Sequence, residues 1–200
     1  MSYIETPPLP APAQGARLLA LGFGAFTAIT VTLSALDLYP VIHPNAFPAT
    51  ILLANVLLVT AYFTVPSINA LGRAMGPYHL AYFHVWRVIA GAIFVYLGAS
   101  GTLNPTFTDR AGFGDILAGL IAGALILLPR RTAFVATFHV VGFADLLLVI
   151  ATGIYINNTA PETLAAITLL PLSLIPLVGV PISILSHVAA LEQVFRGWRA

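Results

Sequence analysis

The sequence predicts an all-α, polytopic integral membrane protein, a bundle of six transmembrane helices with both ends in the cytoplasm. The first observation behind this prediction is composition: 59% of the 200 residues are hydrophobic and only 8% are charged, with a mean hydropathy of +0.96. A soluble domain carries about 25% charged residues, because water must hydrate its surface. The second observation is that the apolar residues fall in long runs, and the third is where the arginines lie.

Six apolar runs can be placed along the chain, each near the roughly 20 residues that a helix needs to cross a bilayer. Prolines, glycines and polar residues separate the runs, as expected where helices end. The predicted spans are residues 17–39, 48–69, 78–100, 112–129, 132–156 and 163–193. Together they form one transmembrane domain, which we place at residues 17–200.

Residues 1–16 precede the first run and form a proline-rich tail. Its four prolines are Pro7, Pro8, Pro10 and Pro12. Proline has no backbone N–H and disrupts a helix interior, so we expect an extended tail with no helix through residues 5–13. The tail has neither the basic start nor the apolar core of a secretory signal.

Arginine placement predicts the orientation, since cytoplasmic loops carry an excess of basic residues. If the chain crosses the bilayer six times, one side holds every loop and terminal arginine except Arg110. The arginines on that side are Arg17, Arg73, Arg130, Arg131, Arg196 and Arg199. We therefore predict that both termini are cytoplasmic and that the chain resides in the inner membrane of a prokaryote.

Composition also excludes several kinds of chemistry. The formal net charge of +1 argues against nucleic acid as a partner, because nucleic-acid binding needs a dense basic face. There is no cysteine, which excludes iron–sulfur clusters and thiol catalysis. All eight basic residues are arginine, so no lysine can form a Schiff base with retinal or pyridoxal phosphate. No hydrolase, phosphate-loop or dinucleotide motif occurs, and no catalytic residue is assigned.

Two charged residues fall near the middle of predicted spans, Arg87 in the third and Asp145 in the fifth. Each costs roughly 2.5–3.5 kcal/mol at a helix centre on insertion scales, so each needs a partner. Both spans run from inside to outside, which places the two residues at a similar depth, and we predict that they pair. Asp115 is expected nearer the outer face. Gly91 and Gly142 are expected to let the third and fifth helices approach.

Histidines form a second group of buried candidates. His84 and His139 each precede a midplane residue by a few positions, and His187 lies in the inner half of the sixth span. Three histidines on three helices are candidate ligands for a transition metal, and His84 with His139 or His187 for haem b. His139 and Asp145 lie about 120° apart around their helix, so His139 is expected to face a different neighbour. A histidine that is only hydrogen-bonded is the alternative.

The sixth span is interrupted by Pro171, Pro176 and Pro181. Each proline removes a backbone donor and kinks a helix unless a neighbour satisfies the freed carbonyl. Broken helices line the sites of many transporters. The sequence thus allows a small transporter that works through this helix and the Arg87–Asp145 pair.

Several stretches resemble known sequences. They are Phe83-His84-Val85-Trp86-Arg87, the run from Ala111 to Gly119, and Leu174-Ile175-Pro176 followed by His187. They are similar to uncharacterised six-span bacterial inner-membrane proteins with no assigned activity, over the third to sixth helices. The resemblance implies the architecture and no mechanism. A weaker likeness to haem-bearing membrane anchors of respiratory complexes rests on a histidine, an arginine and a glycine in one span, and the spacing here departs from that pattern.

These observations favour a non-enzymatic integral membrane protein, either a subunit of a larger membrane complex or a small-molecule-binding bundle. Its partners would be the lipid bilayer and other membrane subunits. Its site would be an intramembrane polar cluster of His84, Arg87, Asp115, His139 and Asp145. A haem- or metal-binding redox protein and a small transporter are the two alternative hypotheses.

Overall fold

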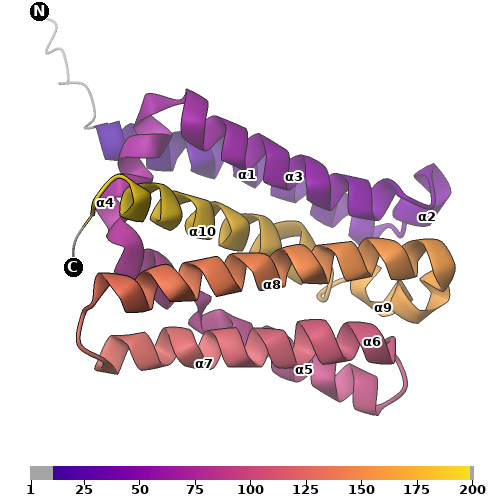
Figure 1. Cartoon of the computed structure of the whole chain (residues 1–200). Coiled ribbons are helices and arrows are strands. Elements are labelled where there is room, and N and C mark those ends of the chain that lie inside the picture. Colours follow the sequence, from indigo (N-terminus) through magenta and orange to yellow (C-terminus); the bar gives the residue numbers. More distant parts are fainter. Residues whose placement is uncertain (1–10, 199–200) are drawn as a thin grey trace, which may run out of the picture.

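The computed structural model describes residues 11–198, and all the regular structure in this range is helical, with no strand. Six of its helices are long and apolar enough to cross a membrane, which confirms the predicted all-α, six-span architecture. They cover Ala11–Ala35, Ala46–Thr64, Pro66–Ala99, Pro105–Leu127, Thr132–Thr159 and Ile175–Phe195. The helices run alongside one another, and the start of α1 lies at the same end of the bundle as the end of α10 (Figure 1).

The first span, α1 (Ala11–Ala35), begins six residues earlier than predicted. The expectation of an extended tail is therefore wrong for residues 11–16, while residues 1–10 lie outside the described part of the chain. Pro12 is the second residue of α1. The first four N–H groups of a helix have no partner within it, so a proline at this position removes no hydrogen bond.

The second span is α3 (Ala46–Thr64), and a short helix, α2 (Tyr39–Ile42), connects it to α1. The third span is longer than predicted and is bent. Its first part is α4 (Pro66–Tyr82), in which Gly76 has a φ of 72° and interrupts the helix. A positive φ is open to glycine, and Pro77 is suited to the first turn of the helix that resumes there.

The helix that resumes at Pro77 within the third span continues through a 3₁₀ turn, η1 (Phe83–Trp86), into α5 (Arg87–Ala99). The fourth span begins at Pro105 with α6 (Pro105–Phe107), where the Asn104 side chain accepts hydrogen bonds from the N–H groups of Thr106 and Phe107. It continues through a π-helical turn, η2 (Thr108–Phe113), into α7 (Gly114–Leu127). The fifth span is α8 (Thr132–Thr159).

The predicted start of the sixth span, residue 163, is wrong. Two short helices occupy that region, η3 (Pro161–Leu164) and α9 (Ala165–Thr168), and the chain then leaves helical structure until η4 (Ile175–Gly179). Pro171 lies in this interval, and Pro176 is the second residue of η4; neither proline can donate a backbone hydrogen bond to an earlier carbonyl. The membrane-spanning helix proper is η4 followed by α10 (Val180–Phe195).

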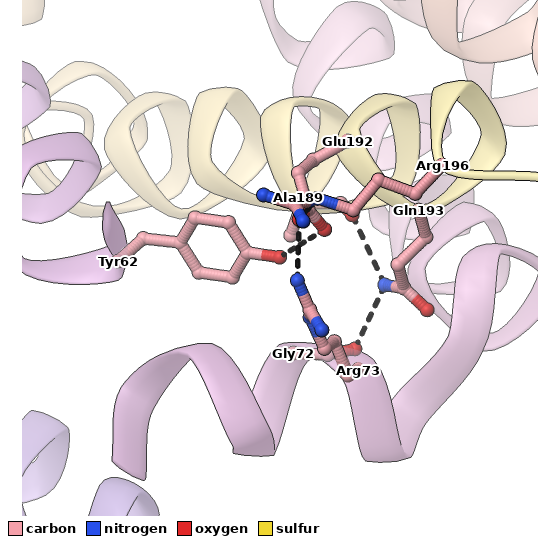
Figure 2. Close-up of polar contacts among 7 residues, drawn as sticks. All are labelled: Tyr62, Gly72, Arg73, Ala189, Glu192, Gln193 and Arg196. Carbon is pink, nitrogen blue, oxygen red and sulfur yellow. Dashed lines mark hydrogen bonds and ion pairs between the residues drawn. The ribbon is translucent and has the colours of Figure 1, made fainter. Parts of the chain in front are cut away.

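One end of the bundle is closed by a polar cluster around Glu192 of α10. Its carboxylate lies 2.6 Å from Nη2 of Arg73, accepts a hydrogen bond from the Tyr62 hydroxyl at 3.2 Å, and pairs with Arg196 (Figure 2). Beside it, Gln193 Nε2 donates to the carbonyl of Gly72 at 3.1 Å. These contacts join α3, α4 and α10 at this end of the bundle.

The buried apolar residues form clusters on both sides of a polar layer. Along α8, Val135 and Phe138 belong to one apolar cluster, and Val149 and Ile156 belong to another. His139 lies between these two pairs in the sequence and is fully buried. The fold therefore encloses polar side chains within an otherwise apolar interior, where each needs a partner or a ligand.

Candidate functional site

Three histidines from three separate spans meet in the interior. His84 comes from η1, His139 from α8 and His187 from α10, and each has a relative exposure of 0%. One ring nitrogen from each lies within 4.8 Å of those of the other two. Sequence periodicity indicated that His139 faces a different neighbour from Asp145, and the neighbour is His187.

The hydrogen bonds of His139 assign protons to two of the three rings. Its Nε2 lies 3.0 Å from the carbonyl oxygen of Pro77, which can only accept, so Nε2 carries the proton. In a neutral imidazole Nδ1 then has a lone pair, and this atom lies 2.8 Å from Nδ1 of His187. His187 Nδ1 therefore donates, and Nε2 of His187 is left with a lone pair. That nitrogen is buried and has no hydrogen-bond partner among the described residues.

The third ring is assigned in the same way. The Ser186 hydroxyl donates to the carbonyl of Ser183 at 2.8 Å, so it accepts from Nε2 of His84, 2.6 Å away. His84 Nδ1 is then the unprotonated nitrogen, and it too is buried without a partner in residues 11–198. The interior thus holds two imidazole lone pairs that no group among the described residues satisfies.

Two buried, unpartnered imidazole lone pairs beside a third histidine are suited to a metal ion. Neutral imidazole is a ligand for zinc, copper, nickel and iron, and the hydrogen bond at the other ring nitrogen orients it. Here the Pro77 carbonyl orients His139, and the Ser186 hydroxyl orients His84. His139 Nδ1 would become the third ligand once its contact with His187 is released.

The packing of the three rings argues against haem b held between His84 and His187. A haem held by two histidines needs a flat space for its macrocycle between them. His84 and His187 instead stack directly, with ring centroids 4.0 Å apart and an interplanar angle of 24°. His139 packs edge-on against His187 at 5.0 Å.

Gly142 provides the space that His187 occupies. A Cβ atom at residue 142 would lie 2.6 Å from Cε1 of His187, so even alanine would displace the ring. Gly91 lies against Gly112 and Ile116 of the fourth span. The expectation that these two glycines bring the third and fifth helices together is therefore wrong. Gly91 faces the fourth span, and Gly142 faces the sixth.

A charged cluster lies one helical turn along the chain from His84. Arg87 is fully buried, its Nε lies 2.6 Å from Oδ1 of Asp115, and its Nη2 pairs with Oδ2 of Asp145. Its Nη1 has no hydrogen-bond partner among the described residues. One arginine with two carboxylates leaves the cluster a formal charge of −1.

The depth predicted for Asp115 was wrong. The fourth span begins at Pro105 rather than at residue 112, so Asp115 lies near the middle of that span and not close to its outer end. The sequence signal was the Asn104-Pro105 pair, an N-cap followed by proline at the first helical position.

Sequence analysis missed the groups that orient the histidines. Ser183 and Ser186 precede His187 on α10, and polar residues at this spacing in an apolar span were a detectable signal. The Pro77 carbonyl carried no such signal, because every residue has a backbone carbonyl and the sequence does not show which side chain approaches it.

Residues 46–195 match a family described as "Domain of unknown function (DUF8737)", and this range contains the three histidines and the charged cluster. No curated protein and no solved structure matches the chain.

Proposed function

The chain belongs to the DUF8737 family, and we propose that it is a non-enzymatic integral membrane protein that binds a transition-metal ion at His84, His139 and His187. The observation that carries this proposal is the pair of buried lone pairs, on His84 Nδ1 and His187 Nε2, that have no partner among residues 11–198. An unsatisfied buried polar atom is costly, and a metal ion would satisfy two at once.

The site has further properties that suit a metal. Its three donors are neutral nitrogens, which suit copper, zinc and nickel better than calcium or magnesium. Each donor ring comes from a different span, so a bound ion would link η1, α8 and α10. The charged cluster around Arg87 carries a formal charge of −1, which favours a cation nearby.

Metal analysis of the purified protein tests the proposal. We expect wild-type protein incubated with Zn²⁺ or Cu²⁺ and then washed to retain one ion per chain, measured by mass spectrometry of the metal. His84→Ala, His139→Ala and His187→Ala should each weaken binding by about tenfold or more, since loss of an orienting group alone costs roughly 10–100-fold. His79→Ala is the matched control, because His79 is exposed and lies outside the triad.

Two outcomes would overturn the proposal. One is a variant lacking all three histidines that retains as much metal as the wild type. The other is a His79→Ala variant that loses as much metal as the triad variants. Absorption of bound Co²⁺ adds a readout of the ligand set, because its spectrum changes with each lost imidazole.

We also propose that the protein resides in the inner membrane of a prokaryote, with both termini cytoplasmic and other membrane subunits packed against it. Four of the arginines expected inside lie close together at one end of the bundle. Arg73 and Arg196 share Glu192, Arg130 lies 5.5 Å from the centre of the Tyr78 ring, and the backbone of Arg131 bonds the Tyr78 hydroxyl. Large apolar side chains such as Leu127 and Ile89 are exposed on the spans, where lipid or a partner would cover them.

Reporter fusions test the orientation. Fusions after Asn45 and after Gly101 should report the periplasm, and a fusion after the last residue should report the cytoplasm. A periplasmic C-terminal reporter would contradict the proposed orientation.

A further inference from the structure

A groove runs between α7 and α8 on the face of the bundle that the bilayer contacts. Its volume is about 350 Å³, and apart from Thr137 its lining is apolar from Leu128 and Phe134 at one end to Gly114 near the other. Along α7 the lining runs from residue 114 to residue 128, a length of about 20 Å at 1.5 Å per residue. Leu117 and Val141 on its walls are 61% and 57% exposed, so the groove opens toward lipid.

A carboxylate lies at the deep end of this groove. Asp145 lines it, and its side chain is 22% exposed although it lies in the middle of a span. Oδ2 of Asp145 pairs with Arg87, whereas Oδ1 has no hydrogen bond to any described residue. A Cβ atom at Gly114 would lie 2.5 Å from that Oδ1, so glycine here keeps the oxygen accessible.

The two ends of the groove carry opposite charge. At the deep end, Arg87 is shared by two carboxylates, which leaves a formal charge of −1 in an apolar layer. At the other end, the guanidinium of Arg131 lies 5.8 Å from the centre of the Phe134 ring, which lines the groove. A ligand with a positive head is therefore attracted to the deep end and repelled from the other.

We propose that this groove binds a membrane-soluble long-chain amine, with its ammonium group on Asp145 and its alkyl chain along the groove toward Leu128. An ammonium donates to Asp145 Oδ1 and neutralises the excess charge, and burial of the chain supplies the affinity. An anionic lipid with its head near Arg131 would have to place the end of its chain against the unpaired Oδ1 of Asp145. The proposal goes beyond metal binding and does not depend on it.

Binding of dodecylammonium to the protein in phosphatidylcholine nanodiscs tests the proposal, measured by native mass spectrometry. We expect one bound amine per chain, and no comparable binding of dodecanol. Asp145→Asn should weaken binding about tenfold or more, the change that loss of one charge-assisted hydrogen bond brings. Asp115→Asn is the matched control: it removes the same charge from the same arginine, but Asp115 does not line this groove.

Introduced cysteines locate the bound chain. The native protein has none, so each introduced thiol is unique. Ile121 lines the groove and Leu120 is exposed on the same helix outside it. Dodecylammonium should slow alkylation of the Ile121→Cys variant by a lipid-soluble maleimide and leave the Leu120→Cys variant unchanged.

The proposal fails if Asp145→Asn and Asp115→Asn weaken binding equally, if dodecanol binds as well as the amine, or if both cysteines are protected alike. It also fails if phosphatidylglycerol displaces the amine and Arg131→Gln abolishes that effect, which would identify an anionic lipid as the occupant. His84→Ala should bind dodecylammonium normally, so failure of the metal proposal would leave this result intact.

Discussion

Replacing Arg87 with leucine is expected to destabilise the protein by about 3–5 kcal/mol, the cost of leaving a buried charge without its partner. Arg87 is fully buried and is the only described partner of the carboxylates of Asp115 and Asp145, which would then face each other in the bilayer centre with no cation. The measurement is the free energy of unfolding in mixed micelles titrated with denaturing detergent.

Substitutions of the two acidic partners are expected to destabilise the protein less than substitution of Arg87. Asp145→Asn leaves the Arg87–Asp115 pair, which is neutral. This variant should therefore lose clearly less free energy of unfolding than Arg87→Leu. Adding Asp115→Asn and Asp145→Asn to Arg87→Leu should restore part of the lost stability, because no unpaired charge then remains. If this triple variant is no more stable than Arg87→Leu alone, the three residues do not act as one charged cluster.

Arg73→Leu is the control for this series. It removes an arginine that also pairs with a carboxylate, but its side chain is 46% exposed at the end of the bundle. Glu192 has a side chain that is only 9% exposed, but it keeps its pair with Arg196. The loss should therefore stay in the range of an exposed pair, about 0–1 kcal/mol. A loss as large as that of Arg87→Leu would show that depth in the membrane does not set the cost.

Gly91→Ala is the second substitution with a large expected effect, about 1–3 kcal/mol of destabilisation from overpacking. A Cβ atom at residue 91 would lie 2.8 Å from both the backbone nitrogen and Cγ1 of Ile116, and would also collide with the carbonyl oxygen of Gly112. Because backbone forms part of this wall, the third and fourth spans would have to separate. Arg87 and Asp115 come from these two spans, so their contact should be weakened too.

Gly123→Ala provides the matched control for that prediction. It makes the same change within α7, but a Cβ atom there meets nothing within 4 Å. We expect its unfolding free energy to stay within about 0.5 kcal/mol of the wild type, or to rise slightly through helix propensity. Equal losses in the two variants would contradict a close approach of the helices at Gly91. The unfolding titration used for the Arg87 series measures both.

Much of the site can be predicted from sequence because the bilayer restricts where polar residues lie. An arginine, two aspartates and three histidines within apolar runs must turn inward, since lipid offers them no hydrogen bonds. The depth of Arg87 follows from counting residues along a helix of known rise. The same counting failed for Asp115, because the predicted span began at residue 112 and not at Pro105. Hydropathy does not register a capped, partly polar first turn at Asn104-Pro105.

The sequence by itself determined that this is a membrane protein with six spans, and which of its polar residues lie within those spans. Composition and the length of the apolar runs are enough for this, because a helix needs about 20 apolar residues to cross a bilayer. Only the tertiary structure decided which of those residues meet. His139 faces His187 because Gly142 leaves room for that ring, and the proton on His139 is set by the carbonyl of Pro77, which is 62 residues away in the chain. Contacts of this kind depend on rotations and distances between helices that are far apart in the chain, and helical periodicity within one span carries no information about them.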